Sequence, residues 1–91
     1  MRTFSRTAQF KKDVKRAGKR GKDAAELKAV LELLIEGGPL PPEYRDHPLR
    51  GEFAGSRDCH IQPDWILIYT LTAKETHVRF ERTGTHSDLF R

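Results

Sequence analysis

The first third of the chain opens with hydrophobic residues at helical spacing. Phe10, Val14 and Ala17 recur at intervals of four and three residues, so they form one apolar stripe. This stripe predicts an amphipathic helix that starts near Thr7 and ends at the glycines between positions 18 and 21.

A second stripe predicts a second helix over residues 24–36. Asp23 provides an acidic N-cap and Glu26 an acid three residues later, as in a capping box. Gly37, Gly38 and Pro39 end the pattern. The break between the two stripes is short, which predicts a helical hairpin. The stripe consists of Leu27, Val30, Leu31 and Leu34.

The second half of the chain changes to the pattern of β-strands. Residues 56–62 and 76–82 alternate between apolar and polar side chains, and residues 64–71 are almost continuously apolar, β-branched or aromatic. Pro63 and residues 72–75 supply turns between them. The pattern predicts an antiparallel β-meander with a buried central strand.

The remaining segments complete the expected order of elements. Residues 2–5 resemble a short strand, residues 37–55 hold four of the five prolines and predict a loop, and residues 85–91 predict a short tail or single turn after Gly84. The order is therefore β-α-α-β-β-β. We expect an α+β fold with both helices packed on a small sheet.

Composition limits the class of protein. The chain has 91 residues, enough for one domain, and no apolar run long enough for a membrane-spanning helix. The basic N-terminus lacks the apolar segment of a secretory signal, so we expect a cytoplasmic protein without a membrane partner. The single cysteine, Cys59, excludes an internal disulfide and is expected to be a small strand residue.

Charge is distributed unevenly along the chain. Residues 1–28 carry a net charge of +7 and the remaining residues −3, which together make the overall +4. Rows of like charge at i, i+4 spacing weaken a helix slightly, so they are easier to explain if they meet a polyanion. An ordinary solvated helix face is the alternative interpretation. The rows on the first predicted helix comprise Lys11, Lys12, Lys15, Arg16, Lys19 and Arg20.

Side chains suited to acid–base chemistry gather at strand ends and in the proline-rich loop. If the turns converge, these groups could cleave RNA, with histidine as acid or base and arginine binding the phosphate. Such a reaction requires no metal ion or other cofactor. The candidates are His47, His60, Asp64, Arg82 and His86.

Other aromatic and imidazole groups allow more ordinary interpretations. His77 lies on a strand among charges without obvious partners, so we assign it no catalytic role. The histidines follow none of the short ligand spacings of zinc sites, and we predict no metal. Trp65 and Phe90 are each either core residues or platforms on which an RNA base stacks.

Three sequence blocks carry a more specific signal. They are residues 46–51 with H-P-L-x-G, residues 57–69 with D-x-H-x-x-P-D-W, and residues 79–90 with E-R-T-G-T-H. In this order they closely resemble the YafQ family of bacterial toxins, part of the RelE/ParE superfamily. The resemblance runs over most of the chain and is looser in the helical hairpin.

The resemblance implies a microbial-RNase-like (RelE-like) fold and a type II toxin. Such a toxin cleaves mRNA in the A site of the 70S ribosome, and a cognate antitoxin holds it inactive. On this basis we expect the six basic residues of the first helix to bind ribosomal RNA. The positions that match the family's functional set are His47, His60, Asp64, Arg82, His86 and Phe90, with Trp65 beside them.

Roles for these residues follow as hypotheses. His86 is the candidate acid at the leaving oxygen and His60, oriented by Asp64, the candidate base, while His47 could share either task. Arg82 is expected to hold the scissile phosphate.

Two other functions stay open at this point. A gyrase poison of the ParE type shares the fold, although such toxins lack this histidine-rich set. A non-catalytic regulator that binds RNA or ribosomes would also suit the basic helix.

Overall fold

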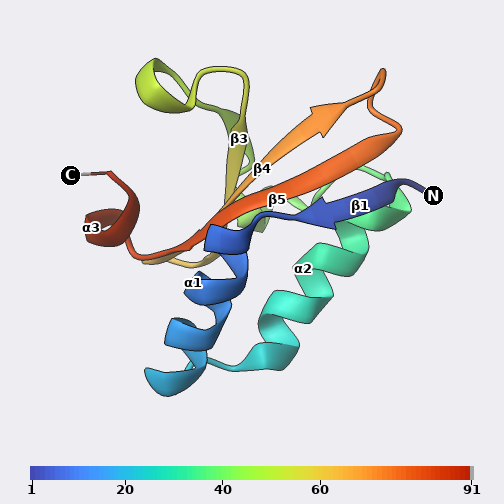
Figure 1. Ribbon diagram of the computed structural model, residues 1–91. Helices are drawn as coiled ribbons and strands as arrows, with labels where there is room; N and C mark the ends of the chain where they lie inside the picture. Colours follow the sequence, from blue (N-terminus) through green and yellow to red (C-terminus); the bar gives the residue numbers. More distant parts are fainter. Residues whose placement is uncertain (91) are drawn as a thin grey trace.

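A five-stranded sheet forms the centre of the computed structural model, which describes residues 1–90 (Figure 1). Helices α1 and α2 cover one face of this sheet, and α3 lies at the end opposite the N-terminus. This arrangement confirms the predicted α+β class. The elements are β1 (Thr3–Arg6), α1 (Ala8–Lys19), α2 (Ala24–Glu36), β2 (His47–Pro48), β3 (Arg57–Gln62), β4 (Trp65–Thr72), β5 (His77–Gly84) and α3 (His86–Leu89).

The sheet is mixed. Its strand order is β1-β5-β4-β3-β2, and β3, β4 and β5 form the predicted antiparallel meander. The N-terminal strand β1 adds to β5 in parallel, with Thr3 opposite His77. The ring of His77 bonds the hydroxyls of Thr3 and Ser5 at 2.7 and 2.8 Å. His77, to which the sequence assigned no catalytic role, thus joins the two strands by hydrogen bonds.

Side-chain caps fix where the two long helices begin. The Thr7 hydroxyl accepts the Phe10 N–H, and the Asp23 carboxylate accepts the Ala25 N–H. The predicted capping box of α2 is incomplete, because the Glu26 carboxylate accepts a hydrogen bond from Gln62 of β3 instead. This bond ties the start of α2 to the sheet.

The main core lies between the helices and the sheet. Both predicted stripes are part of it, and Trp65 of β4 is 2% exposed, with its Nε1–H donating to the Thr83 hydroxyl at 3.0 Å. Cys59 is a buried strand residue, as expected. Burial raises the pKa of its thiol to about 12, so it is not a nucleophile near neutral pH.

A smaller core occupies the opposite face of the sheet. Ile66 and Ile68 of β4 point away from the helices and pack with Leu89 of α3, with Leu49 and Phe53 against them. This contact draws α3 and the proline-rich segment onto the open face. That segment, predicted as loop throughout, contains β2 and two 3₁₀ helices, Pro42–Tyr44 and Gly51–Phe53. No helix within residues 1–90 is long and apolar enough to span a membrane.

Candidate active site

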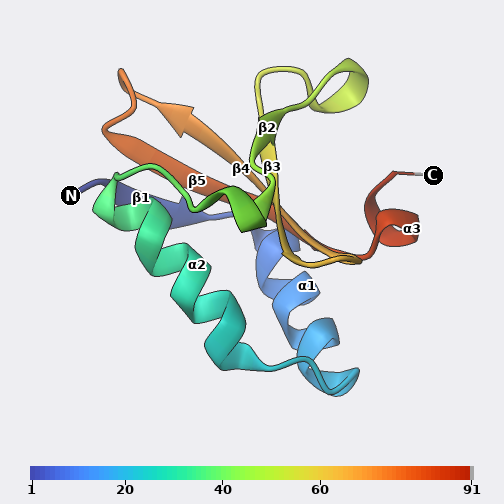
Figure 2. The same ribbon diagram turned by 180° about the vertical axis from the view of Figure 1, so that it is seen from behind.

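Three imidazoles lie in a row on the open face of the sheet. His60 of β3 is central, with its ring centroid 6.2 Å from that of His47 and 5.5 Å from that of His86. His47 comes from β2, which lies alongside β3 (Figure 2), and His86 opens α3. The predicted convergence of the loop, the first bend of the meander and the tail is confirmed.

His86 is held by Asp64 from the turn between β3 and β4. One carboxylate oxygen accepts both the His86 backbone N–H at 2.9 Å and its ring Nδ1 at 2.6 Å. These two bonds lower the pKa of Asp64. The prediction that Asp64 orients His60 is wrong, since the partner of Asp64 is His86. The His86 side chain remains 52% exposed.

A buried carboxyl, Asp58, lies beneath the other two imidazoles. It is 3% exposed, and its Oδ1 lies 3.0 Å from Nδ1 of His47, its register partner across β2 and β3. Burial raises the pKa of Asp58, while the nearby imidazoles of His47, His60 and His86 oppose that rise. Although Asp58 Oδ1 lies close to His47, it forms no hydrogen bond among residues 1–90. His60 Nδ1 is likewise buried without a hydrogen-bond partner there.

Neighbouring bonds place His47. Its Nδ1–H donates to the carbonyl of Arg45 at 2.9 Å. The preceding residue, Asp46, accepts the Tyr69 hydroxyl at 2.5 Å and the Arg57 Nε–H at 3.2 Å. The segment that carries His47 is thereby fixed to β3 and β4.

Arg82 is locked to α1 by a buried aspartate. Its Nε and Nη2 donate to the two oxygens of Asp13 at 2.9 and 3.1 Å, and the carboxylate also accepts the Thr83 N–H at 3.2 Å. Burial by itself would raise the pKa of Asp13, but the hydrogen bonds from Arg82, Gln9 and Thr83 outweigh it and lower the pKa. The Asp13 carboxylate therefore binds the edge of β5 at Thr83, past Phe80, where the pairing of β5 with β1 ends.

The position of Arg82 brings it into the same region as the imidazoles. It lies opposite Ile68, which lies opposite Asp58, so its backbone is about 10 Å from that of Asp58, two strands away. A hollow of about 350 Å³ lined by Arg82 and Phe53 adjoins this end of the sheet, and another of about 180 Å³ is lined by His60. The two hollows are separate, since they share no lining residue.

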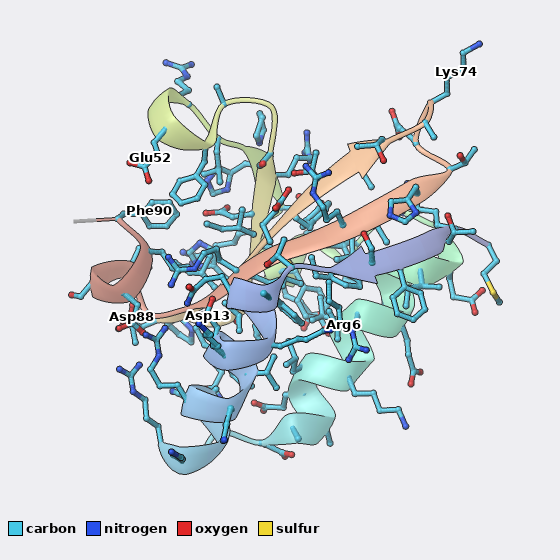
Figure 3. All side chains as sticks on the ribbon, in the orientation of Figure 1. Arg6, Asp13, Glu52, Lys74, Asp88 and Phe90 are labelled. Carbon is cyan, nitrogen blue, oxygen red and sulfur yellow. The ribbon has the colours of Figure 1, made fainter. Side chains whose placement is uncertain are left out.

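Phe90 is the accessible aromatic group of this region. It is 38% exposed, packs edge-on against Phe53 with centroids 5.7 Å apart, and lies 6.2 Å from the His86 ring. Figure 3 shows it directed toward the segment that carries Glu52. Trp65 is the opposite case: its burial leaves no ring face for a base, and the core interpretation replaces the RNA-stacking one.

The basic residues of α1 divide into two groups. Arg16 and Arg20 form ion pairs with Asp88 of α3, at 3.5 and 2.7 Å. The four lysines of the set are exposed and have no ion pair within the described chain. They are Lys11, Lys12, Lys15 and Lys19.

Two buried carboxyl groups of this region, those of Asp13 and Asp58, were not predicted from the sequence as parts of the site. Asp13 follows Phe10 by three residues and precedes Ala17 by four, so a carboxylate within an apolar stripe was a detectable signal of a buried charge. Asp58 carried no such signal, because it alternates with Cys59 as a solvated strand residue would. Among residues 1–90, no group of three His, Cys, Asp or Glu side chains is arranged to hold a metal ion.

Comparison with known proteins identifies the family. Residues 2–91 match the family described as the bacterial toxin of type II toxin–antitoxin system, YafQ. The mRNA interferase toxin YafQ of Escherichia coli strain K12 is 54% identical over 90 residues, which cover 98% of this chain and 96% of the relative.

Solved structures agree over the full length. YafQ from E. coli strain BL21(DE3) superimposes with a TM-score of 0.93 at 51% identity, and YafQ in the E. coli DinJ–YafQ complex with 0.91 at 52% identity, each covering 100% of both chains. Family, sequence and fold coincide. The chain belongs to the YafQ family of bacterial type II toxins.

Proposed function

We propose that this chain is an endoribonuclease that cleaves mRNA on the ribosome and that a cognate antitoxin holds inactive. The relative from E. coli is named an mRNA interferase, and another structure is of YafQ with DinJ. The observation that carries the proposal is the row of three imidazoles beside an anchored arginine. A base, an acid and a cation are the groups that phosphodiester transfer requires.

His86 acts as the acid. Asp64 accepts from Nδ1, so Nε2 of the protonated ring can donate to the departing oxygen. In this step the ribose 2′-oxygen forms a bond to phosphorus, the bond from phosphorus to the 5′-oxygen breaks, and the His86 proton moves to that oxygen. The products are a 2′,3′-cyclic phosphate and a free 5′-hydroxyl.

His60 takes the proton of the 2′-hydroxyl. It adjoins His86 in the row, and its Nδ1 is enclosed, so proton transfer runs through Nε2. His47 lies on the other side of His60 and can share this task. The pairing of Asp64 with His86 leaves His60 without the carboxylate that would fix its ring.

Arg82 binds the scissile phosphate. Asp13 engages only Nε and one hydrogen of Nη2, so Nη1 and the second Nη2 hydrogen remain for phosphate oxygens. Because Asp13 fixes the Arg82 guanidinium before the phosphate binds, less side-chain entropy is lost on binding. Phe90 provides a ring on which a base of the mRNA stacks.

Docking on the ribosome involves the exposed lysines of α1. Lys11, Lys12, Lys15 and Lys19 present charge without internal partners in the described chain. Binding to ribosomal RNA through them predicts affinity that falls steeply with salt. Neutralising all four should weaken ribosome binding and flatten its salt dependence, and an unchanged salt slope would remove them from the interface.

The decisive experiment maps RNA 5′-ends after induced expression. New 5′-hydroxyl ends within mRNA codons are expected for the wild-type chain and for His77→Gln, a histidine variant outside the row. They should be absent for His86→Ala. Slowed translation without new ends would instead indicate a non-catalytic regulator, and DNA damage with intact mRNA would indicate a gyrase poison; either result overturns the proposal.

A further inference from the structure

Five charged side chains form one continuous chain of ion pairs between β5, α1 and α3. Arg82 Nε lies 2.9 Å from Asp13, Asp13 lies 3.2 Å from Arg16, Arg16 lies 3.5 Å from Asp88, and Asp88 lies 2.7 Å from Arg20. Positive and negative groups alternate throughout. Figure 3 shows Asp13 and Asp88 on the same side of the molecule, between α1 and α3.

Each end of this chain holds a group that the proposed reaction needs. Arg82 is itself one end. The other end fixes α3, which carries His86 and is followed by Phe90. A helix of four residues is unstable by itself, so its position depends on tertiary contacts. Asp88 provides one, because the same carboxylate accepts the Thr85 N–H that starts α3 and the guanidinium of Arg20.

The backbone at Gly84 is adapted to this chain of ion pairs. A Cβ placed on Gly84 would lie 2.9 Å from Asp88 Oδ2, 3.0 Å from Asp88 Cβ and 3.1 Å from Arg16 Nη2. Gly84 does not have a positive φ, so its glycine is explained by this close approach and not by its backbone conformation. The absence of a side chain at the end of β5 lets Arg16 and Asp88 meet.

We infer that Arg16 and Arg20 are positioning residues, which hold Arg82 and α3 in register for cleavage, and are not part of the RNA-docking surface. The inference rests on the proposed function for its catalytic consequence. Arg16 connects the two parts of the chain of ion pairs, since its Nη2 contacts both Asp13 and Asp88. The two arginines thus differ in role from the four lysines on the same helix.

The first test measures the position of α3 without any assay of activity. The amides of Leu89 in α3 and of Phe90, which caps its end, donate to Thr85 O and His86 O, at 3.2 and 2.7 Å. Hydrogen exchange at these two amides reports on the opening of α3. In the double variant Arg16→Gln/Arg20→Gln, exchange should be at least about tenfold faster than in wild type.

A matched control removes the same charge from the same helix. Lys15→Gln/Lys19→Gln is expected to leave exchange at Leu89 and Phe90 at the wild-type rate. Asp88→Asn is a milder variant, since its amide oxygen can still accept the Thr85 N–H while the guanidinium pairs are weakened; it should also accelerate exchange. Equal protection in the arginine, lysine and Asp88 variants would overturn the inference.

The second test separates positioning from docking by kinetics. With ribosomes programmed with mRNA, the arginine double variant should lower kcat about tenfold with little change in KM, because docking remains while alignment is lost. The lysine double variant should instead raise KM, because it weakens docking, with little change in kcat. The reverse pattern would return the arginines to the docking surface. A wild-type chain that cuts no RNA would overturn the proposed function alone, since the exchange test stands without it.

Discussion

The carboxylate of Asp64 holds His86 by its backbone and its ring at once. Both the amide N–H and Nδ1 bond the same oxygen, at 2.9 and 2.6 Å. The carboxylate therefore fixes where α3 starts and which ring nitrogen is free. A single exposed turn residue sets the geometry of the proposed acid.

Replacement of Asp64 by asparagine tests this relationship. The amide oxygen of Asp64→Asn can still accept the backbone N–H, but it has no charge to stabilise the imidazolium. We expect the rate of single-turnover cleavage to fall by roughly 10- to 100-fold, part of the ~10²–10⁴ attributed to an acid or base. Because Asp64 is largely exposed, unfolding by urea should change little. Wild-type cleavage would remove Asp64 from the mechanism.

The stability contributed by Asp88 should depend on pH. Hydrogen bonds from Arg20 and Thr85 lower its pKa, so the unfolded chain binds more protons than the folded chain as pH falls below about 4. This contribution is present above that pH and is lost below it. Urea unfolding of Asp88→Asn should show the largest loss of stability near neutral pH and a smaller loss near pH 3. A loss that grows on acidification would contradict the assignment.

Asp58 should show the opposite trend. Burial raises its pKa, despite the opposing imidazoles of His47, His60 and His86, so ionisation costs stability as pH rises above about 4. The free energy of unfolding of the Asp58→Asn variant, relative to that of the wild type, should therefore be higher at pH 7 than at pH 4. The free energy of unfolding at both pH values provides the measurement. An equal effect at the two values would show that Asp58 keeps its ordinary pKa.

Phe90 should contribute through its ring. In Phe90→Leu the apolar volume is largely kept but the stacking face and the edge contact with Phe53 are lost. We expect about 10-fold weaker cleavage, in line with the ~1–3 kcal/mol of a base stacked on an aromatic side chain. Phe90→Tyr should restore cleavage. Equal rates for the leucine and tyrosine variants would show that only apolar contact matters.

Trp65 should affect stability and not cleavage. The Trp65→Phe variant loses the bond from Nε1 to Thr83 and part of the core volume, for a cost of about 1–3 kcal/mol in unfolding free energy. Cleavage per folded molecule should match wild type, since the side chain is almost completely buried. A fall in cleavage without a fall in stability would restore the RNA-stacking interpretation.

Local patterns were sufficient for most of the fold. The apolar stripe from Phe10 to Ala17 predicts a helix, and the alternation around Cys59 predicts a strand of the meander. Both predictions succeed because each periodic pattern is complete within one element. The parallel pairing of β1 with β5 lies outside such reasoning. Thr3 and His77 are 74 residues apart, and no local period reports on that contact.

The site was predictable in its members and not in its contacts. The motifs identified all three imidazoles of the row, and the strand ends suggested that they meet. The bond between Asp64 and His86 depends on how α3 turns back after β5, and no local pattern in the sequence reports on that turn. The separation of the arginines from the lysines on α1 likewise depends on Asp88, whose place the helix pattern does not reveal.

The parallel addition of β1 to β5 has a consequence for the order of folding. Within residues 1–90, β1 pairs with β5 alone, and Thr3 meets His77 across 74 residues of chain. Closing so long a loop has an entropic cost that the turns of the meander do not have. We therefore expect β1 to join the sheet last, after β3, β4 and β5 have paired.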